Sequence, residues 1–357
     1  MEKILFFGYT MDMGGAEKSL LDTVNFLSDK YDISLYLLDK KGILLKDLSN
    51  KVKVYEIKKN IFQYILFRYL PYFRKKTINR IANKVDYSFA VGYIEGRSAT
   101  WVSDIKKNIK KIAWIHCDVS KFDIGISDTE AKKTYDEMDK IICVSKMAKE
   151  SFCKKYSIPG DKVSVIYNFI DAEEILRKSQ EKVTDCCKEK TFTFLNVGRH
   201  TEEDKKLTRL IEAAKKLKED NLDFRILLVG SGNKTQEYKK MVNEYKLENN
   251  IIFLGKKQNP YPYFKLADSL ILTSEYEGFP VVYLEAMILN IPIITTNVSD
   301  SLQIIQNKHG VVTQKNVNSI YNAMKNAIIN GISQKEEFDY KEYNQEINEK
   351  LEKLINA

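Results

Sequence analysis

Short apolar runs rich in β-branched and aromatic residues alternate along the chain with longer segments that repeat apolar residues at helical spacing. The first run, KILFFGYT, begins at Lys3, and the following segment GGAEKSLLDTVNFLSD has helical periodicity at Leu20, Leu21, Val24 and Leu27. Strands that alternate with helices of about 10–15 residues are typical of parallel sheets built from βαβ units. The pattern therefore predicts an α/β protein.

Further strand candidates in the first half are DISLYLLD, KVKVYEI, YSFAVGY, KIAWIH, KIICVS and VSVIYN. The second half repeats the pattern with strands at FTFLNVG, FRILLVGSG, NIIFLG, SLILTS and IPIITT, and with helices over TRLIEAAKKL, near TQEYKKMVNEY and from Val281. Each half starts with a strand that runs into glycine, Gly8 in the first half and Gly198 in the second. We therefore expect two tandem Rossmann-like domains that face a central cleft, with ligands at the carboxyl ends of the strands.

The length of 357 residues suits two domains of about 150–200 residues each better than one core. We expect the first domain over residues 1–170 and the second over residues 191–330. Residues 171–190 are polar and lack β-branched runs, which predicts the connection between the domains. Residues 331–357 are charged with spaced apolar positions, so we expect a helix that packs back across the domains.

The composition excludes several classes of protein. With 30% charged and 44% hydrophobic residues the chain reads as a globular protein, and no signal-peptide pattern precedes the first strand. The most apolar helical window, residues 61–73, is shorter than the roughly 20 residues of a membrane span and is interrupted by Arg68 and Pro71. The five cysteines form no C-x-x-C pair, which favours reduced thiols in the cytoplasm over a disulfide framework or a metal site.

The net charge of +8 is concentrated in one stretch. Residues 51–84 carry a single acid, Glu56, against ten cations: Lys51, Lys53, Lys58, Lys59, Arg68, Arg74, Lys75, Lys76, Arg80 and Lys84. Aromatic residues run through the same stretch, which favours contact with an anionic membrane, where each cation contributes about 1 kcal/mol. A helix with inward aromatics and solvated lysines, or a nucleic-acid surface, would give the same pattern.

The segment SEYEGFPVVYLEAM, residues 274–287, places Glu277 and Glu285 on either side of a turn and a helix start. The simplest interpretation is a loop followed by a helix whose first turns are acidic. We expect the preceding strand to end near Thr273 and the helix to begin at about Val281. Both carboxylates would then lie at the carboxyl edge of the sheet, where ligands bind.

Other candidates also follow strands, and each has a plain structural alternative. Gly14 and Gly15 open the first helix and could offer amides to an anion or simply form a turn. His116 ends the run KIAWIH and could be a satisfied histidine at a domain edge. Gly230, in GSG, could be a second glycine turn at the cleft or a strand–loop glycine.

In FLNVGRHTEEDKK, residues 194–206, a strand leads into Arg199, and Lys205 and Lys206 precede the next helix. An arginine fork and a lysine ammonium can together neutralise a diphosphate, most usefully when the diphosphate is a leaving group. The alternative is a set of exposed basic loop residues beside Glu202, Glu203 and Asp204.

Taken together, these motifs resemble the retaining glycosyltransferases of family four, the "group 1" type, which have the GT-B fold. The resemblance runs through nearly the whole chain in the order GGAEKSL, WIHCD, VSKMAKESF, IYNFID, VGRHTEEDKKLTRLIEA, LLVGSG, IIFLG, EYEGFPVVYLEAM and IPIITT. It implies that the first domain binds the acceptor and the second binds a nucleotide sugar. No cofactor or metal is expected, because the implied mechanism needs neither a metal nor a dedicated base.

The resemblance also implies roles for individual residues. Arg199 and Lys205 would clamp the diphosphate, Glu277 would hold the hydroxyls of the transferred sugar, and Glu285 would accept hydrogen bonds from the ribose. Further donor contacts are implied for the amides of Phe279, Val281, Val282 and Gly15, for Gly230 and, on the sugar, for His116. Two positions depart from the common pattern: Pro280 replaces a frequent glycine and removes an N–H, and Lys206 stands where glycine is common.

The sequence thus predicts an enzyme that moves a hexose or N-acetylhexosamine from a nucleotide sugar to a lipid-linked or polymeric acceptor of a bacterial surface polysaccharide. We expect the nucleotide sugar to be a UDP sugar. We expect it in the cytoplasm, on the inner face of the membrane through residues 58–84, without a nucleic-acid partner. The residues expected on this acceptor side are Arg68, Arg74, Lys75, Lys76 and Arg80. A polyol-phosphate polymer of the teichoic-acid type or a soluble acceptor is the alternative, and so is a non-catalytic nucleotide-sugar-binding protein. The non-catalytic alternative is disfavoured because all four charged donor residues are present, namely Arg199, Lys205, Glu277 and Glu285.

Overall fold

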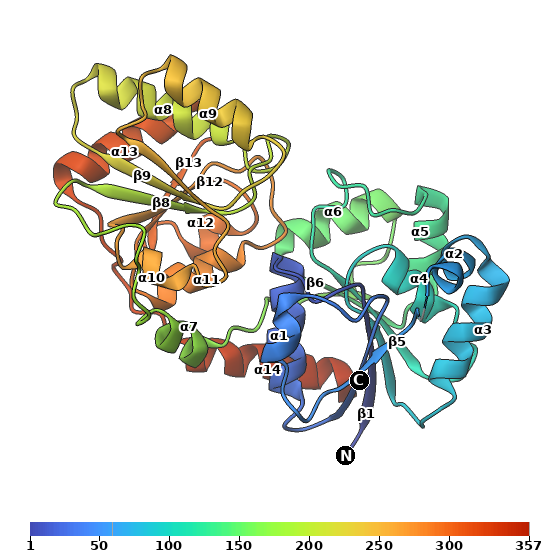
Figure 1. The fold of residues 1–357 in the computed structure, drawn as a ribbon. Coiled ribbons are helices and arrows are strands. Elements are labelled where there is room, and N and C mark those ends of the chain that lie inside the picture. Colours follow the sequence, from blue (N-terminus) through green and yellow to red (C-terminus); the bar gives the residue numbers. More distant parts are fainter. Residues whose placement is uncertain (59, 357) are drawn as a thin grey trace. The chain divides into compact units, whose positions relative to one another are not determined.

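The computed structural model describes residues 1–58 and 60–356, so Lys59 of the basic stretch lies outside the described residues. The chain divides into two compact units (Figure 1). The N-terminal unit comprises Met1–Ile170 and Tyr343–Ala357, and the C-terminal unit comprises Asp171–Glu342.

The N-terminal unit is built on a 7-stranded sheet with the order β3-β2-β1-β4-β5-β6-β7. Its neighbouring strands pair in parallel. The strands are β1 (Lys3–Gly8), β2 (Asp32–Leu37), β3 (Lys53–Glu56), β4 (Phe89–Gly92), β5 (Lys110–Ile115), β6 (Lys140–Cys143) and β7 (Val163–Val165). All seven coincide with the runs predicted from the sequence.

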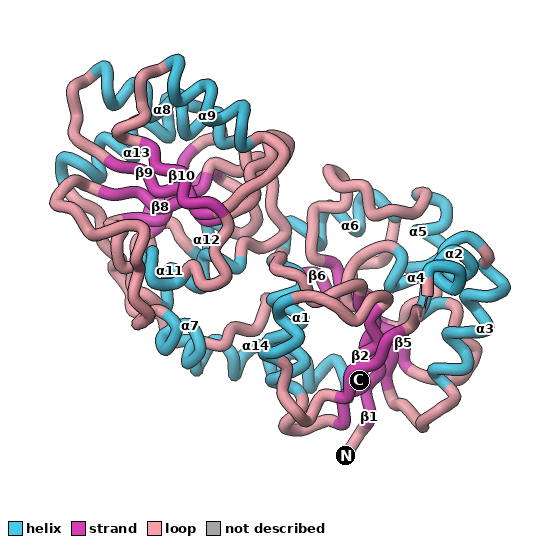
Figure 2. The backbone as a smooth tube through the Cα atoms, viewed as in Figure 1, coloured by secondary structure: helices cyan, strands magenta, loops and turns pink. Residues whose placement is uncertain are grey.

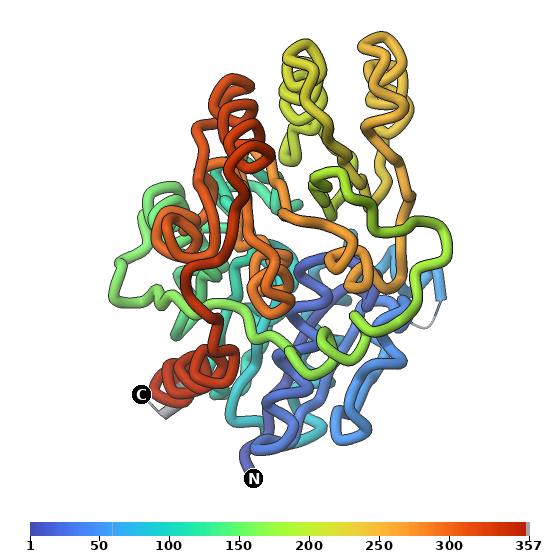
Figure 3. The backbone as a smooth tube through the Cα atoms, turned by 90° about the vertical axis from the view of Figure 1, so that its left-hand side faces the viewer, coloured from blue at the N-terminus to red at the C-terminus, as the bar shows by residue number. Residues whose placement is uncertain are grey.

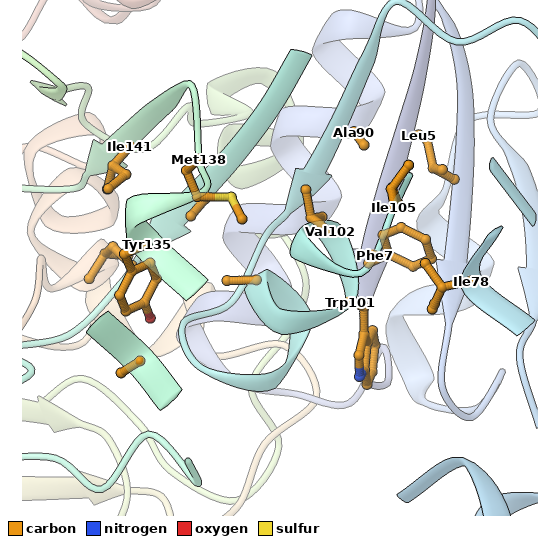
Figure 4. Packing of buried hydrophobic residues seen from close by; sticks show 14 of the residues in the cluster. Leu5, Phe7, Ile78, Ala90, Trp101, Val102, Ile105, Tyr135, Met138 and Ile141 are labelled. Carbon is orange, nitrogen blue, oxygen red and sulfur yellow. The ribbon is translucent and has the colours of Figure 1, made fainter. Parts of the chain in front are cut away.

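Helices cover both faces of this sheet, because successive residues of a buried strand point to opposite sides. In β1, Leu5 and Phe7 join the core cluster on one face, where Phe7 and Trp101 lie close together (Figure 4). On the other face the ring of Phe6 contacts Tyr93, whose hydroxyl bonds to side chains of α1. The helical segments are α1 (Gly15–Leu27), η1 (Ile43–Asp47), α2 (Ile61–Tyr69), α3 (Pro71–Ala82), α4 (Arg97–Ser103), α5 (Asp128–Asp136) and α6 (Lys146–Tyr156).

The C-terminal unit repeats the architecture, with helices around a central sheet (Figure 2). This sheet has 6 parallel strands in the order β10-β9-β8-β11-β12-β13. Its strands are β8 (Thr193–Val197), β9 (Arg225–Val229), β10 (Ile251–Gly255), β11 (Ser269–Leu272), β12 (Ile293–Thr296) and β13 (Gly310–Thr313). The edge strand β13 is absent from the sequence prediction. It has four residues, and its pattern GVVT is too short to stand out from a loop.

Three helices of this unit, α8, α9 and α13, lie side by side on one face of the sheet, whereas α10 and α11 cover the other (Figures 1 and 3). Buried leucines of α8 pack with Met324 of α13 in one core cluster. The helices are α7 (Ala172–Lys178), α8 (Leu207–Glu219), α9 (Thr235–Glu244), α10 (Tyr261–Phe264), α11 (Val281–Ile288), α12 (Ser301–Ile304) and α13 (Val317–Asn330). The predicted α/β class, with two parallel sheets in tandem, is confirmed.

Residues 171–190, expected as a plain connection, contain α7 and group with the C-terminal unit. Asp171 caps this helix by accepting a hydrogen bond from the amide of Glu174, and Ile175 is fully buried. A seven-residue helix with one buried side on an otherwise polar surface gives little periodicity, which is why the sequence pattern did not reveal it.

The last helix, α14 (Tyr340–Asn356), is shorter than the predicted helix over 331–357. It begins where it does because the carboxylate of Asp339 accepts hydrogen bonds from the amides of Lys341 and Glu342. The helix packs on the N-terminal unit, where the side chain of Asn344 bonds to both backbone groups of Ile170. Residues 331–339 precede this cap and are not helical.

The basic aromatic stretch forms two helices, α2 and α3, that meet at Leu70 and Pro71. Phe67 is buried, but Phe62, Tyr69 and Tyr72 are exposed, so the aromatic side chains do not all pack inward. Among the described residues, no helix combines the length and the apolar character that crossing a membrane requires.

Candidate functional site

Strand order reverses between β8 and β11 in the C-terminal unit, and the loops after these two strands carry the predicted donor residues. Such reversals are where open α/β sheets bind ligands, beyond the carboxyl ends of the strands. Hydrogen bonds join the two loops: the amide of Glu275 donates to the carbonyl of Asp204 at 2.7 Å. The hydroxyl of Thr273 donates to the carbonyls of Lys205 and Lys206, each at 3.1 Å.

Lys205 and Glu277 form an ion pair across these loops. The ammonium lies 2.5 Å from Oε1 of Glu277, and the two side chains are only 19% and 13% exposed. The hydroxyl of Ser274 donates to the same carboxylate oxygen at 2.7 Å. Because the pair is well shielded from water, removal of either member leaves the other charge poorly compensated.

Arg199 lies at the edge of this arrangement, and its side chain is 70% exposed. One nitrogen donates to Asp204 at 3.1 Å, and Asp204 also accepts a hydrogen bond from the amide of Lys205. Asp204 itself is buried, so it fixes the loop while most of the arginine fork stays accessible.

Lys206, the alternative to Lys205, points elsewhere. Its ammonium lies 3.4 Å from Glu202, and its backbone is left-handed, with φ of 50°. A left-handed residue at this position accounts physically for the glycine that is common there, because glycine adopts that conformation without a steric penalty.

The turn after β11 leads into α11, which begins at Val281 as predicted, and places Glu285 in the second turn. Pro280 occupies the N-cap of this helix, with an extended ψ of 107°. No side chain among the described residues caps this helix. The amides of Val281 and Val282 belong to its first turn, whose N–H groups have no partner within the helix. Glu285 is 8% exposed.

The remaining donor candidates have structural roles of their own. Phe279 is 6% exposed and packs edge-on against Tyr283 at 6.4 Å, while the hydroxyl of Ser299 bonds to the carbonyl of Gly278. Gly230 has φ of 148°, and a Cβ there would lie 1.8 Å from the carbonyl oxygen of Gly198. The close approach of two loops therefore explains this glycine, and its donor contact stays a prediction.

Two candidates lie in the N-terminal unit. Gly15 is the first residue of α1, and a Cβ there would meet nothing within 4 Å, so packing does not require glycine. His116 follows β5, and its amide donates to the carboxylate of Glu95 at 2.9 Å. Nε2 of His116 is buried and has no hydrogen-bond partner among the described residues, and the ring lies 4.7 Å from that of Tyr93.

The structure thus brings Arg199, Lys205, Glu277 and the start of α11 together at one edge of one sheet. Comparisons with known proteins give this arrangement a family. The family model for glycosyl transferases group 1 matches residues 179–346, and the model for glycosyltransferase family 4 matches residues 13–174. The chain belongs to these glycosyltransferases.

Curated relatives align with the glycosyltransferase over most of its length. One is the N-acetylgalactosamine-N,N'-diacetylbacillosaminyl-diphospho-undecaprenol 4-alpha-N-acetylgalactosaminyltransferase of Campylobacter jejuni, 25% identical over 318 residues, which are 83% of this chain and 81% of that protein. Another is the capsular polysaccharide biosynthesis glycosyltransferase CapH of Staphylococcus aureus, 25% identical over 323 residues, which are 86% of this chain and 84% of that protein.

Among solved structures, HepE of Anabaena, crystallised with UDP and glucose, is similar to the glycosyltransferase with a TM-score of 0.75. The alignment covers 99% of this chain and 100% of that chain at 19% identity. At this identity the likeness shows the fold, which is the expected GT-B fold. Within residues 1–58 and 60–356, no three His, Cys, Asp or Glu side chains gather as metal ligands would.

His200, which sequence reasoning left without a role, is a structural residue of the glycosyltransferase. It is 1% exposed, and its Nδ1 lies 2.9 Å from the hydroxyl of Thr235 at the start of α9. Thr235 also bonds to Gly232, so His200 ties the loop after β8 to the loop after β9. This role depends on two loops lying close together in space, and the spacing of residues in the sequence does not reveal that contact.

Burial of His116 makes the stability of the glycosyltransferase depend on pH. Burial lowers the pKa of His116 from 6.5 to about 3, so the unfolded chain takes up a proton below pH 6.5 that the folded chain excludes. The stability that the folded chain gains from a neutral His116 is therefore fully present above pH 6.5, and it is lost as the pH drops toward 3. Between about pH 7.5 and about pH 5.5 we expect wild type to lose about 1 kcal/mol more than His116→Gln in chemical unfolding. Burial also lowers the pKa of His200, which acts in the same direction and is common to both proteins. Equal losses of stability in wild type and His116→Gln would contradict a lowered pKa of His116 in the folded chain.

Proposed function

We propose that this glycosyltransferase moves a hexose or N-acetylhexosamine from a UDP sugar to a lipid-linked acceptor in the synthesis of a bacterial surface polysaccharide, with retention of the anomeric configuration. The observation that carries the proposal is the shielded Lys205–Glu277 pair at the reversal of strand order. This pair places one positive and one negative group at the edge where a nucleotide sugar would lie.

The diphosphate of the donor would contact Arg199, Lys205 and the free amides at the start of α11. An ammonium has three donors, so Lys205 can hold Glu277 and a phosphate oxygen at once. The exposed fork of Arg199 can bind a second phosphate oxygen in a bidentate manner. The amides of Val281 and Val282 would add the partial positive charge of a helix N-terminus.

The two glutamates would hold the two ends of the donor. Glu277 lies beside Lys205 and would accept hydrogen bonds from hydroxyls of the transferred sugar. Glu285 lies further along α11 and would accept them from the ribose. Glu277 and Glu285 are eight residues apart in the sequence, which spans the turn and the first turns of α11. This segment would lie along the bound donor.

In the reaction, the bond between C1 of the sugar and the β-phosphate oxygen breaks, and its electron pair stays on the diphosphate. Arg199, Lys205 and the α11 amides stabilise the charge that grows there. The acceptor oxygen forms the new bond to C1 from the same face, and its proton passes to the departing phosphate oxygen. All charges and atoms balance without a metal ion or a protein base.

The N-terminal unit would contribute Gly15 and His116. With a pKa of about 3, His116 is neutral at physiological pH and can donate or accept a hydrogen bond without adding charge beside an oxocarbenium-like sugar. The amide of Gly15, in the first turn of α1, would contact a phosphate.

A lipid-linked acceptor is supported by the surface of α2 and the start of α3. Six large apolar residues there are between 47% and 80% exposed: Ile61, Phe62, Ile65, Tyr69, Leu70 and Tyr72. Exposed apolar residues beside Lys75, Lys76 and Arg80 suit the surface of an anionic bilayer. The Campylobacter relative is named for an acceptor on diphospho-undecaprenol, a lipid carrier.

We predict that the chain floats with vesicles that contain anionic lipid. Changing Lys75, Lys76 and Arg80 to glutamine should lower the partition coefficient by about 10²-fold, because each cation contributes about 1 kcal/mol. Arg74 is left intact because it is paired with the buried Asp104 at 2.7 Å. The control changes the exposed Lys239, Lys240 and Lys265 of the C-terminal unit to glutamine, with the same loss of charge. Equal flotation of both variants would reject the membrane claim.

The proposed activity is tested by incubating the purified protein with a panel of UDP and GDP sugars, with and without EDTA, and an extract of lipid-linked acceptors. We expect release of UDP from one UDP sugar, at the same rate with EDTA, and a product whose anomeric proton couples as in the donor. Absence of turnover with every donor would refute an enzyme, and an inverted product would refute the retaining mechanism.

A further inference from the structure

The N-terminal unit contains a pocket of about 310 Å³ at the carboxyl edge of its sheet, close to where the strand order reverses between β1 and β4. Tyr9, which follows β1, Arg97, which opens α4, and Trp101 form part of the lining. Two further arginines, Arg68 of α2 and Arg74 of α3, line it as well. The volume is that of roughly ten water molecules, enough for a small polar group and the first atoms of a substituent.

Aromatic side chains form the base of the pocket. Trp101 packs edge-on against Tyr9 and Phe67, with ring centroids 5.3 Å away in both pairs, and rests on Phe7 at 6.1 Å (Figure 4). Trp101 and Phe67 are each only 3% exposed, so this base is part of the core and does not collapse when the pocket is empty.

The three arginines are held in different ways. The Arg74 guanidinium donates to the buried carboxylate of Asp104 at 2.7 Å, which largely compensates its charge. Arg68 donates to the hydroxyl of Tyr64 at 2.6 Å and lies over the rings of Tyr64 and Tyr69. Arg97 donates from Nε to the carbonyl of Gly125 at 3.1 Å.

Arg68 and Arg97 form no ion pair with a carboxylate in the part of the chain that the structure describes. Among the described residues that line the pocket, the one acid is Glu130 of α5, and it is exposed. The lining therefore keeps an excess of positive charge on planar forks that are oriented by neutral partners. Such forks match the oxygens of a phosphate group.

The wall that positions Arg97 depends on glycine. Gly96 has φ of 77°, and a Cβ there would lie 2.0 Å from the carbonyl oxygen of Ile124. This close approach brings the loop at residues 124–126 against the start of α4 and fixes the bond from Arg97 to Gly125.

Helix α2 connects the pocket to the exposed apolar surface. Tyr64, Phe67 and Arg68 face the pocket, whereas Ile61, Ile65 and Tyr69 are spaced four residues apart and are 47% to 72% exposed. One helix thus presents a cationic side to the pocket and an apolar side to its surroundings.

We propose that this pocket binds the diphosphate of an amphiphile, the lipid diphosphate of the acceptor, with its apolar chain along the exposed side of α2. The identification of this amphiphile as the acceptor rests on the proposed function. The new step is the assignment of the phosphate contacts to Arg68 and Arg97, in a site separate from the donor residues of the C-terminal unit. The phenol of Tyr9, whose pKa burial raises, stays protonated and can donate to the same phosphate.

The probe is geranyl diphosphate, a short isoprenyl diphosphate, titrated calorimetrically into the full chain with UDP present to fill the donor site. Arg68→Gln and Arg97→Gln should each weaken binding of the probe by about 10–10²-fold, since a charge-assisted hydrogen bond contributes about 1.5–3 kcal/mol. Arg177→Gln, an exposed arginine of α7, is the matched control and should bind the probe as wild type does. Geraniol and inorganic diphosphate should each bind more weakly than geranyl diphosphate.

Fluorescence locates the probe independently of these variants. The chain has two tryptophans, and in Trp114→Phe only Trp101 remains, so the probe should change the emission of that variant. No binding of geranyl diphosphate, or equal binding by wild type, Arg68→Gln and Arg97→Gln, would overturn the proposal. Vesicles of phosphatidylglycerol that bind through Arg68 and Arg97 when geranyl diphosphate does not would also overturn it, in favour of a bilayer headgroup.

Failure of this proposal is distinguishable from failure of the proposed function. UDP binding and donor hydrolysis by the wild-type chain report the C-terminal unit, whereas binding of geranyl diphosphate reports the pocket. If the probe fails to bind while UDP sugar is hydrolysed, the pocket assignment is wrong and the transferase stands. If the probe binds and no UDP sugar is turned over, the transferase is wrong and the anion site stands.

Discussion

Replacing Lys205 by glutamine is expected to lower kcat by about 10²–10³-fold, corresponding to about 2.7–4 kcal/mol of transition-state stabilisation. The ammonium is the charge that we place closest to the departing diphosphate, and its shielding from water by the two loops strengthens its effect. Glutamine keeps a hydrogen-bond donor of similar reach but removes the charge. The measurement is steady-state turnover of the preferred UDP sugar with saturating donor.

Lys206→Gln is the matched control for this change. The two lysines are adjacent, and Lys206 has its own carboxylate partner in Glu202, so both variants lose one charge from one ion pair. We expect Lys206→Gln to retain kcat within about threefold of wild type. If both variants lose activity equally, the general field of the loop is responsible and the specific role of Lys205 is wrong.

Replacing Glu277 by glutamine should lower kcat by about 10²-fold while UDP binds with an affinity within about threefold of wild type. The reason is that Glu277 is assigned to the hydroxyls of the transferred sugar, which UDP lacks. The change also leaves the Lys205 ammonium without its carboxylate, at a cost of about 1–3 kcal/mol of stability. Thermal melting should therefore be recorded, and turnover measured well below the melting temperature.

Glu275→Gln controls for loss of an ion pair in the same turn. Glu275 is paired with Arg209, two residues from Glu277 in sequence, and has no assigned contact with the donor. We expect its kcat to remain near that of wild type. If Glu277→Gln turns over the UDP sugar as fast as Glu275→Gln does, the assigned role of Glu277 is wrong. If Glu277→Gln loses UDP affinity in parallel with turnover, Glu277 contacts the nucleotide instead of the sugar.

Much of the fold follows from local patterns in the sequence. Buried parallel strands such as β1 and β9 read as short, continuous apolar runs because both faces of the sheet are covered by helices. The start of α11 at Val281 follows from the proline before it and the apolar residues after it. These features depend on neighbours in the sequence, which is why they could be predicted.

The elements that were missed depend on contacts between distant segments. Strand β13 is recognisable only by its pairing with β12, and the start of α14 is set by the cap at Asp339. Arg74 was expected on the membrane side with the other cations of its segment. Its pairing with Asp104, 30 residues away, is not visible in the spacing of charges.

For the site, the sequence indicates which residues follow which strands, and strand order then determines which loops meet. Arg199 and Glu277 could be expected at one edge because β8 and β11 are neighbours in a doubly wound sheet. The ion pair of Lys205 with Glu277, the buried anchor Asp204 and the arginine pocket could not be predicted. Each depends on side-chain reach across loops that share no sequence pattern.

Hydrogen–deuterium exchange of the full chain with and without UDP tests most directly whether the C-terminal unit holds the donor through these loops. We predict slower exchange on UDP binding at residues 198–206 and 274–286, which include Arg199, Lys205, Glu277 and Glu285. Uridine, which lacks the phosphates, should protect residues 198–206 less than UDP does. Unchanged exchange in both segments under conditions where UDP binds would contradict the account.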